Sequence, residues 1–241
     1  MNKLVSYELS DKVATVTLND PDRLNCFSAQ LVNELHEALD KAIDDAHHLV
    51  FRAQGKGFSG GFDLSGIEQE TDGDLLLRLV RIEQLLQRVR HYDGSTTALV
   101  HGACYGAAAD LVLACRTRVA TSTARFLMPG MKFGIVLGTR RLRDTLGEVN
   151  AYQLLDRRKP FDSDEALQTG FASAVVEQDQ WQEFLIDHLD VLSQYTPRAY
   201  AQRMQQLTPD TRDSDMAALV GSVTDGSIQE RLQAFVASMK C

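Results

Sequence analysis

Alternating apolar and polar residues near the N-terminus predict a β-strand over residues 13–18. Ala14, Val16 and Leu18 fall on one face of this segment, and threonines lie between them on the other face. Residues 3–9 precede it, and a Ser-Asp turn separates the two segments. We therefore expect residues 3–9 and 13–18 to pair as a hairpin.

Further along the chain, short apolar runs alternate with stretches whose apolar residues recur every three or four positions. The runs predict short, largely buried strands at residues 49–51, 98–100, 118–120 and 125–127. The periodic stretches predict helices from the N-cap Ser28 up to Ile43, and at residues 74–90, 106–114, 181–192, 216–223 and 228–236. Strands that alternate with helices imply an α/β fold with a mostly parallel sheet.

The strand signal ends well before the C-terminus. No strand is expected after about residue 179, and only helical periodicity follows. We therefore divide the chain into a core at residues 1–178 and a C-terminal helical subdomain at residues 179–241.

Composition narrows the class of protein. Of the 241 residues, 44% are hydrophobic, which excludes a disordered chain. The formal net charge is −8, from 25 Lys plus Arg against 33 Asp plus Glu, and an acidic chain is unlike a nucleic-acid binder. The start of the chain lacks an apolar signal segment, so we expect a cytoplasmic protein.

Two further features exclude other classes. The least polar stretch, residues 98–115, carries His101 and Asp110, so we interpret it as buried core and expect no membrane partner. Four cysteines at irregular spacing form no CxxC pair, which predicts free thiols and no disulfide or metal framework.

The first candidate site is a glycine-rich turn at residues 55–61, after a buried strand. Glycines allow a backbone to approach a ligand closely, although a tight structural turn also needs them. Gly55, Gly57 and Gly60 fit GxGxxG, but a dinucleotide loop wants an acidic residue about 20 positions later at the end of a second strand. Residues 74–90 are predicted to be helical instead, which disfavours that interpretation.

The second candidate is the small-residue turn that begins at Gly102 and leads into the helix predicted at 106–114. N–H groups at a helix N-terminus lack intrahelical partners, and small side chains leave them accessible; close packing of helix on strand would also explain such residues. Since both turns follow neighbouring parallel strands, each could contribute one N–H to a shared point. That arrangement would form an oxyanion hole for a carbonyl that gains negative charge.

Five ordered segments resemble the crotonase (enoyl-CoA hydratase/isomerase) superfamily. They are LNDPDRLN at 18–25, FSGGFDL at 58–64, VHGACYGAAAD at 100–110, GTRRL at 138–142 and Ala234-Phe235. The resemblance covers nearly the whole chain. It implies a spiral of ββα repeats with a C-terminal helical trimerisation region, so we expect a homotrimer or a dimer of trimers.

The resemblance also implies an acyl-CoA thioester as the ligand, with coenzyme A as part of the substrate and no separate cofactor. It places the two oxyanion donors at the N–H groups of Gly60 and Ala107, and the first catalytic carboxylate at Asp110. The substrate-binding positions that it implies are Asp22, Arg23, Leu24, Phe62, Asp63, Leu64, Gly106, Pro129 and Gly130. Arg23 would pair with a CoA phosphate or remain a solvated surface residue, and Asp63 is expected to stabilise a turn.

The chain departs from the family pattern at both catalytic carboxylates. Typical hydratases use two glutamates; the first becomes the shorter Asp110, which is either a catalytic group or a helix cap. The second, a position where many family isomerases also keep their base, falls on Gly130, which cannot titrate, and the following loop at residues 135–138 is shorter than usual. The sequence therefore disfavours a two-carboxylate hydration mechanism.

Other protonatable groups near the turns have simpler interpretations. His101 is expected to be a hydrogen-bonded core residue and Cys104 an inert core thiol, and Glu68 is expected at the surface. Tyr105 lies on the second turn and stays open as a substitute.

Two functions therefore compete. The first is an acyl-CoA enzyme of the hydratase/isomerase type, in which Asp110 is the only carboxylate left at a family position; decarboxylation or hydrolysis shares the same enolate chemistry. The second is a non-catalytic acyl-CoA binder or scaffold, which the loss of a side chain at Gly130 suggests. A dinucleotide-dependent oxidoreductase ranks behind both.

Overall fold

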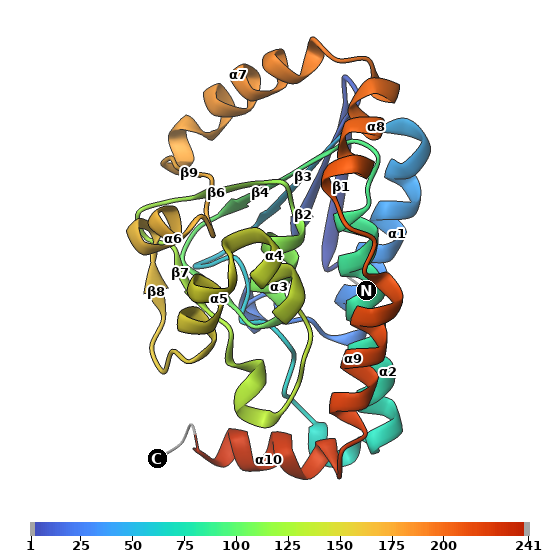
Figure 1. Cartoon of the computed structure of the whole chain (residues 1–241), viewed down its shortest axis with the longest axis vertical. Coiled ribbons are helices and arrows are strands. Elements are labelled where there is room, and N and C mark those ends of the chain that lie inside the picture. Colours follow the sequence, from blue (N-terminus) through green and yellow to red (C-terminus); the bar gives the residue numbers. More distant parts are fainter. Residues whose placement is uncertain (1–2, 239–241) are drawn as a thin grey trace.

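A six-stranded sheet forms the centre of the computed structural model, which describes residues 3–238 (Figure 1). Its strands, in spatial order, are β1 (Val5–Ser10), β2 (Val13–Leu18), β3 (His48–Ala53), β4 (Ser95–Val100), β6 (Thr117–Ala120) and β9 (Ala174–Val175). A second, three-stranded sheet contains β5 (Ala103–Tyr105), β7 (Arg125–Leu127) and β8 (Phe161–Asp162). The α/β class with two sheets and C-terminal helices is confirmed.

The strand pairing agrees with the sequence. β1 and β2 are antiparallel, with Val5 opposite Leu18, and the turn between them places Asp11 and Lys12 at positive φ. Every other pairing in the large sheet is parallel. The carboxyl ends of β3 and β4 therefore meet at one edge, where both glycine-containing turns begin.

Ten α-helices lie within residues 3–238. They are α1 (Ala29–Asp45), α2 (Asp72–Arg90), α3 (Ala107–Ala114), α4 (Thr139–Leu146), α5 (Glu148–Leu155), α6 (Ser163–Thr169), α7 (Trp181–Ser193), α8 (Pro197–Leu207), α9 (Arg212–Val223) and α10 (Ile228–Ser238). Ser28 caps α1 as predicted, since its side chain accepts a hydrogen bond from Leu31 N–H. The apolar face of α1 ends earlier than predicted, because Ile43 is 62% exposed.

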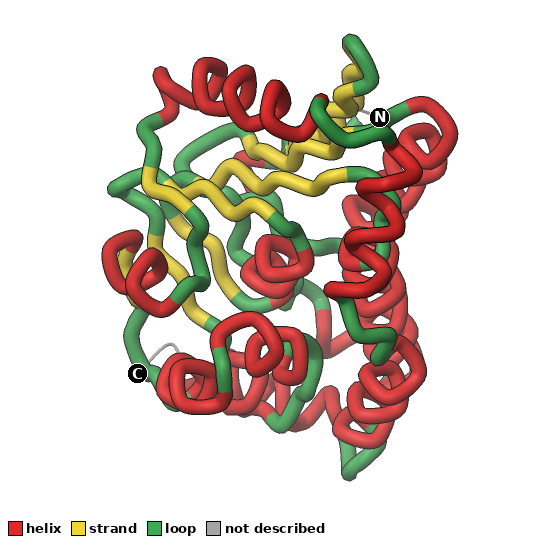
Figure 2. The backbone as a smooth tube through the Cα atoms, turned by 45° about the horizontal axis from the view of Figure 1, so that its top comes forward, coloured by secondary structure: helices red, strands yellow, loops and turns green. Residues whose placement is uncertain are grey.

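The sheet is covered on both faces, and Figure 2 shows the strands between the helices. On one face, Val50, Leu99 and Val119 pack with Trp181 at the start of α7. On the other face lies the main core, which includes α1, part of α2 and α3.

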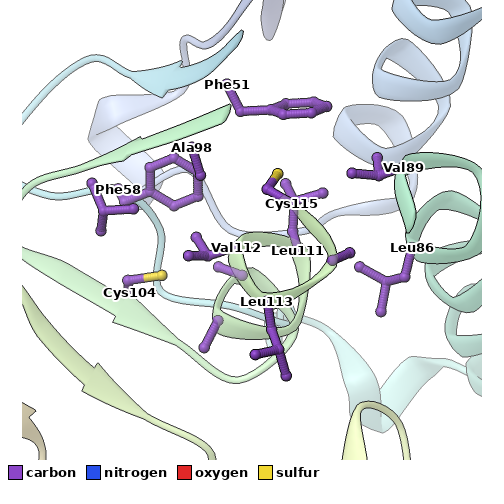
Figure 3. Packing of buried hydrophobic residues seen from close by; sticks show 14 of the residues in the cluster. Phe51, Phe58, Leu86, Val89, Ala98, Cys104, Leu111, Val112, Leu113 and Cys115 are labelled. Carbon is purple, nitrogen blue, oxygen red and sulfur yellow. The ribbon is translucent and has the colours of Figure 1, made fainter. Parts of the chain in front are cut away.

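Helix α3 is the centre of this core. All eight of its residues are buried, which explains why its sequence is almost entirely apolar and small. Figure 3 shows Leu111 of α3 and its C-cap Cys115 next to Leu86 and Val89 of α2, while Phe51 lies on the sheet side. The N-terminus of α3 is thereby fixed relative to β4, which matters for the site.

Two of the C-terminal helices, α9 and α10, pack against α2 of the preceding part of the chain. Leu219 of α9 and Leu232 of α10 share a hydrophobic cluster with Leu75 and Leu79 of α2, and α9 runs beside α2 in Figure 1. A boundary at residue 178 and the role of this region in trimerisation stay predictions.

Two expectations about the chain as a whole can be compared with the structure. Within residues 3–238, no helix combines the length and the apolar character needed to cross a bilayer. Cys26, Cys104 and Cys115 are free thiols, and Cys241 lies outside the described residues.

Candidate active site

The two predicted turns lie side by side. Ser59 N–H donates to the Ala103 carbonyl at 3.0 Å, and Tyr105 N–H donates to the Ser59 carbonyl at 3.0 Å. Phe58 N–H donates to the His101 carbonyl at 2.9 Å, so the pairing continues from the end of the buried strand. Strand β5, which the sequence pattern did not predict, pairs in parallel with β7, and an isolated bridge joins its Cys104 to Ser59 of the first turn.

Gly61 is the point of closest approach between the turns. Its φ of +88° favours glycine, and a Cβ at this position would overlap the Tyr105 carbonyl oxygen. The same Cβ would lie 3.5 Å from the amide nitrogen of Ala107. Any side chain at Gly61 would therefore push the first turn away from the start of α3.

The amide predicted at Gly60 is already used. Its N–H donates to the Leu24 carbonyl at 2.9 Å, so it is not available to a ligand oxygen in this structure. Sequence reasoning missed this because the acceptor belongs to a loop 36 positions earlier, in which Leu24 has a φ of +54°. The Gly60 assignment is corrected accordingly.

The neighbouring Phe62 offers a free amide instead. No acceptor for Phe62 N–H exists among the described residues. The carbonyl of the same peptide unit, at Gly61, accepts a hydrogen bond from Phe27 N–H at 2.7 Å. Because a trans peptide is planar, its N–H points opposite to its carbonyl, so Phe62 N–H faces away from Phe27.

The second predicted amide, at Ala107, is free. Ala107 is the first residue of α3, where N–H groups have no intrahelical partner, and residues 3–238 supply no other acceptor. Gly106 precedes it with φ +53° and ψ −124°, a conformation that glycine tolerates. The amides of Phe62 and Ala107 thus flank the contact at Gly61, and both residues line one cavity.

This cavity has a volume of about 1050 Å³. Its walls are largely apolar and include the predicted residues Leu24, Gly60, Phe62, Leu64, Gly106, Ala107, Asp110, Pro129 and Gly130. A second cavity of about the same volume lies beside α1 and α8, and its described lining comes from neither turn. Because both turns line the first cavity, we take the first cavity as the candidate active site.

Asp110 lines the cavity and is 5% exposed. The helix-cap interpretation is wrong, because Gly106 occupies the N-cap position of α3 and Asp110 accepts no backbone N–H from the described chain. Oδ1 is buried and has no hydrogen-bond partner among the described residues. Burial raises the pKa of Asp110 to about 7, with the Arg141 charge lowering it and the Glu83 charge raising it.

Gly138 makes room for this carboxyl group. A Cβ on Gly138 would overlap Oδ1 of Asp110. Gly138 belongs to the segment GTRRL, which follows the short loop noted in the sequence. The loop thus brings backbone, not a side chain, against the carboxyl.

The position expected for the second carboxylate lies on the cavity wall and carries no side chain. Gly130 lies in a short 3-10 helix, Pro129–Phe133, on the cavity wall. A Cβ at Gly130 would lie 3.2 Å from the Ile135 carbonyl oxygen, so there is little space for a side chain at this position. Among the described lining residues, Asp110 is the only carboxylate.

The loop predicted to hold coenzyme A is tied to the first turn. Arg23 forms an ion pair with Asp63 at 2.6 Å and donates to Ser65 Oγ at 2.8 Å. Asp63 also accepts from Ser65 N–H at 3.1 Å, so it stabilises a turn as expected. Arg23, Asp22 and Asp63 lie outside the cavity lining, whereas Leu24 is 57% exposed on its edge.

Three of the other protonatable groups are less suited to catalysis. His101 is buried, and its Nε2 lies 3.0 Å from the Gly55 carbonyl. Cys104 is buried, and burial raises the pKa of its thiol well above the ordinary value. Glu68 is exposed, and Tyr105 lines the cavity.

Sequence reasoning missed the charged layer behind Asp110. Arg141 of α4 donates to both carboxylate oxygens of Glu83 on α2, at 2.9 and 2.5 Å. Both side chains are almost fully buried, and Asp215 of α9 lies 3.5 Å from Arg141. Two features of the sequence could have indicated this buried ion pair: an Arg within GTRRL and a Glu on the apolar face of residues 74–90.

Helix α10 closes one side of the cavity. Ala234, Phe235 and Ser238 line it. Arg231 donates to the carbonyls of Phe133 and Val223, at 3.1 and 2.8 Å, and so fastens α10 to the cavity wall. The described residues contain no group of three or more His, Cys, Asp or Glu side chains that could hold a metal ion.

Comparisons with known proteins agree with this geometry. The sequence model of the enoyl-CoA hydratase/isomerase family matches residues 8–230. A crystal structure from Bordetella parapertussis that carries the name enoyl-CoA hydratase/isomerase superposes with a TM-score of 0.95 at 39% identity, covering 98% of this chain and 99% of that one.

Two curated relatives of similar sequence carry the names of two different enzymes. A Bacillus subtilis protein named a probable enoyl-CoA hydratase is 29% identical over 177 residues, which cover 70% of this chain and 67% of the relative. The trans-2-decenoyl-[acyl-carrier-protein] isomerase of Streptococcus mutans is 29% identical over 184 residues, covering 73% of this chain and 70% of the relative.

Proposed function

The chain belongs to the enoyl-CoA hydratase/isomerase (crotonase) superfamily, and on that premise we propose that it acts on an acyl-CoA thioester through an enolate. The N–H groups of Phe62 and Ala107 bind the thioester oxygen and stabilise the negative charge that it gains. Coenzyme A enters as part of the substrate. One observation supports this most directly: two amides without a partner among the described residues border a largely apolar cavity, which also holds Asp110 with its unpartnered Oδ1.

Asp110 is the proton-transfer group in this proposal. A carboxyl with a pKa of about 7 is partly ionised at neutral pH, so it can both accept and return a proton. Asp110 is buried in the first turn of α3, three residues after Ala107. It therefore lies on the same helix turn as one of the donors that polarise the carbonyl.

A reaction that needs a single carboxyl suits this site best. Moving a double bond takes one proton from one carbon and returns it to another, which one carboxyl can do. Hydration also requires activation of a water molecule, for which typical relatives use two glutamates. Gly130 supplies neither a second hydratase glutamate nor the base that many family isomerases keep at this position, so Asp110 must move the proton alone, and on that ground we propose double-bond isomerisation ahead of hydration.

Decarboxylation is the alternative, since loss of CO₂ generates the enolate without a base. The observation that favours it is again the single carboxyl in the cavity. A non-catalytic acyl-CoA binder stays the second alternative. The contacts of Asp22, Arg23 and Leu24 with the coenzyme A part, the cytoplasmic location and the homotrimer remain predictions.

A substrate panel tests the proposal. Purified protein is assayed with 2-enoyl-CoA, 3-enoyl-CoA and malonyl-type CoA esters of several chain lengths. We expect turnover of at least one ester, and a fall of about 10²–10⁴-fold in Asp110→Asn, the range of general acid–base catalysis. Asp44→Asn is the matched control, because Asp44 is exposed at the end of α1.

Each outcome separates the candidates. Turnover of a 3-enoyl ester that Asp110→Asn loses supports isomerisation, and turnover of a malonyl-type ester supports decarboxylation. Full activity in Asp110→Asn removes this residue from the mechanism. Tight binding of CoA esters without turnover supports a binder, and no binding at all contradicts every acyl-CoA role.

A further inference from the structure

Arg78 of α2 contacts the first turn at the residue that carries the free amide. Its guanidinium carbon lies 4.2 Å from the centre of the Phe62 ring. Nη2 donates to the Asp63 carbonyl at 2.6 Å, and Nη1 pairs with Glu70 at 2.5 Å. The Arg78 side chain is only 11% exposed, so these contacts are partly shielded from water.

The backbone around Phe62 has few other restraints. On one side, the Gly61 carbonyl is held by Phe27 N–H at 2.7 Å. On the other side, Asp63 N–H reaches the Phe27 carbonyl only at a long 3.4 Å. Gly61 itself has a positive φ, and glycine permits rotation there. Arg78 therefore supplies the short hydrogen bond on the Asp63 side of Phe62.

We propose that Arg78 is a positioning residue that holds Phe62 N–H in place to receive the thioester oxygen. The inference rests on the proposed function, because it assigns the amide the role of an oxyanion donor. A guanidinium suits the task better than an ammonium group, since it can stack on a ring while donating in two fixed directions. The ion pair with Glu70 fixes the orientation of the Arg78 guanidinium.

The experiment measures the polarisation of a bound carbonyl and needs no turnover. Hexanoyl-CoA labelled with ¹³C at the thioester carbonyl is bound to the wild type and to variants, and the infrared frequency of that carbonyl is recorded. Oxyanion donors lower this frequency relative to the free thioester. A residue that only stabilised the fold would change the melting temperature and leave the frequency of the folded protein unchanged.

Three variants report on Arg78. Arg78→Met keeps an unbranched apolar chain over Phe62 but loses the charge and the donors. Arg78→Lys keeps the positive charge but loses the planar guanidinium with its two donor directions. Arg81→Met is the matched control, because Arg81 lies one turn further along α2, and its side chain donates to Gln84 at 3.2 Å and to Asn33 at 3.5 Å.

We expect the frequency in Arg78→Met to return most of the way to that of the free thioester. Arg78→Lys should lie between Arg78→Met and the wild type, and Arg81→Met should match the wild type. With a turned-over ester, Arg78→Met should lower kcat about 10- to 100-fold with a smaller change in KM, since loss of an entire donor costs about 10²–10³.

If Arg78→Met does not fold, the variant Glu70→Gln tests the same inference. It leaves the guanidinium present but removes its ion pair, so a smaller shift in the same direction is expected. Wild-type frequencies in every folded variant at Arg78 and Glu70 would overturn the inference. If the wild type itself leaves the carbonyl at the frequency of the free thioester, the proposed oxyanion hole fails, which is a distinct result.

Discussion

The carboxyl group of Asp110 packs directly against the α carbon of Gly138, so that a methyl group at position 138 would overlap Oδ1. Gly138 has φ −101° and ψ 9°, which an alanine can adopt, so the overlap is the main obstacle to a side chain. The two residues are 28 positions apart, and only the fold brings them together.

Gly138→Ala should therefore destabilise the protein by about 1–3 kcal/mol through overpacking. In an Asp110→Ala background the same change should be nearly neutral, because the overlapping oxygen is gone. Denaturant unfolding of the wild type, both single variants and the double variant measures this coupling. An equal cost in both backgrounds would show that the contact does not matter.

Asp110 should also make stability depend on pH. Its pKa is about 7 in the folded chain and near 3.8 when unfolded, so between these pH values the folded state keeps a proton that the unfolded state has released. Stability attributable to Asp110 therefore falls as pH rises from about 4 to about 7 and is constant above that. Over the whole window the change is at most roughly 4 kcal/mol.

Asp110→Asn lacks this titration. The difference in free energy of unfolding between wild type and Asp110→Asn should therefore shift by roughly 3 kcal/mol between pH 5 and pH 8, to the disadvantage of the wild type. Urea unfolding of both proteins at the two pH values measures it. A difference that is independent of pH would refute the raised pKa.

Gly61→Ala should separate the two turns. The new Cβ would overlap the Tyr105 carbonyl, beside the amide of Ala107. We expect a loss of about 10²–10³ in turnover, comparable to the removal of one oxyanion donor. Gly66→Ala is the control: its φ is +73° but nothing lies within 4 Å of its Cβ, so it should cost about 1–2 kcal/mol of stability and leave turnover unchanged. Equal activity of both variants would contradict the close approach.

Arg141→Met should strongly destabilise the fold. It leaves Glu83, which is fully buried, without its partner, and breaking such a pair costs about 3–5 kcal/mol. Replacing Glu83 with Met in the same chain should recover most of the loss. Thermal and urea unfolding of the single and double variants will measure this, and a double variant no more stable than Arg141→Met would contradict the pairing.

The backbone of the site could be predicted from sequence because its signals are local. Ser28 caps a helix through an atom three residues away, and both glycine-containing turns follow strands that the apolar runs mark. The free amide could not be assigned in this way. Gly60 loses its N–H to Leu24, a contact made by a loop that is distant in sequence, and Phe62 becomes the free donor.

Charged residues inside the fold were equally hard to predict. Glu83 lies on an apolar helix face, where sequence reasoning marked only periodicity, and its partner Arg141 is 58 positions away. Arg78 is one of many arginines on α2, and only the structure distinguishes its contact with Phe62 from the surface position of Arg81. Such roles depend on tertiary neighbours, which no local pattern encodes.

The walls of the cavity extend along the chain from Leu24 to Ser238. During synthesis, the sheet and both turns leave the ribosome long before α10, so the nascent protein carries an open apolar trough. The trough gains its last wall only when Arg231 fastens α10 along one side of it. A chain truncated before α10 would keep its oxyanion amides but expose an apolar surface. We expect such a chain to aggregate.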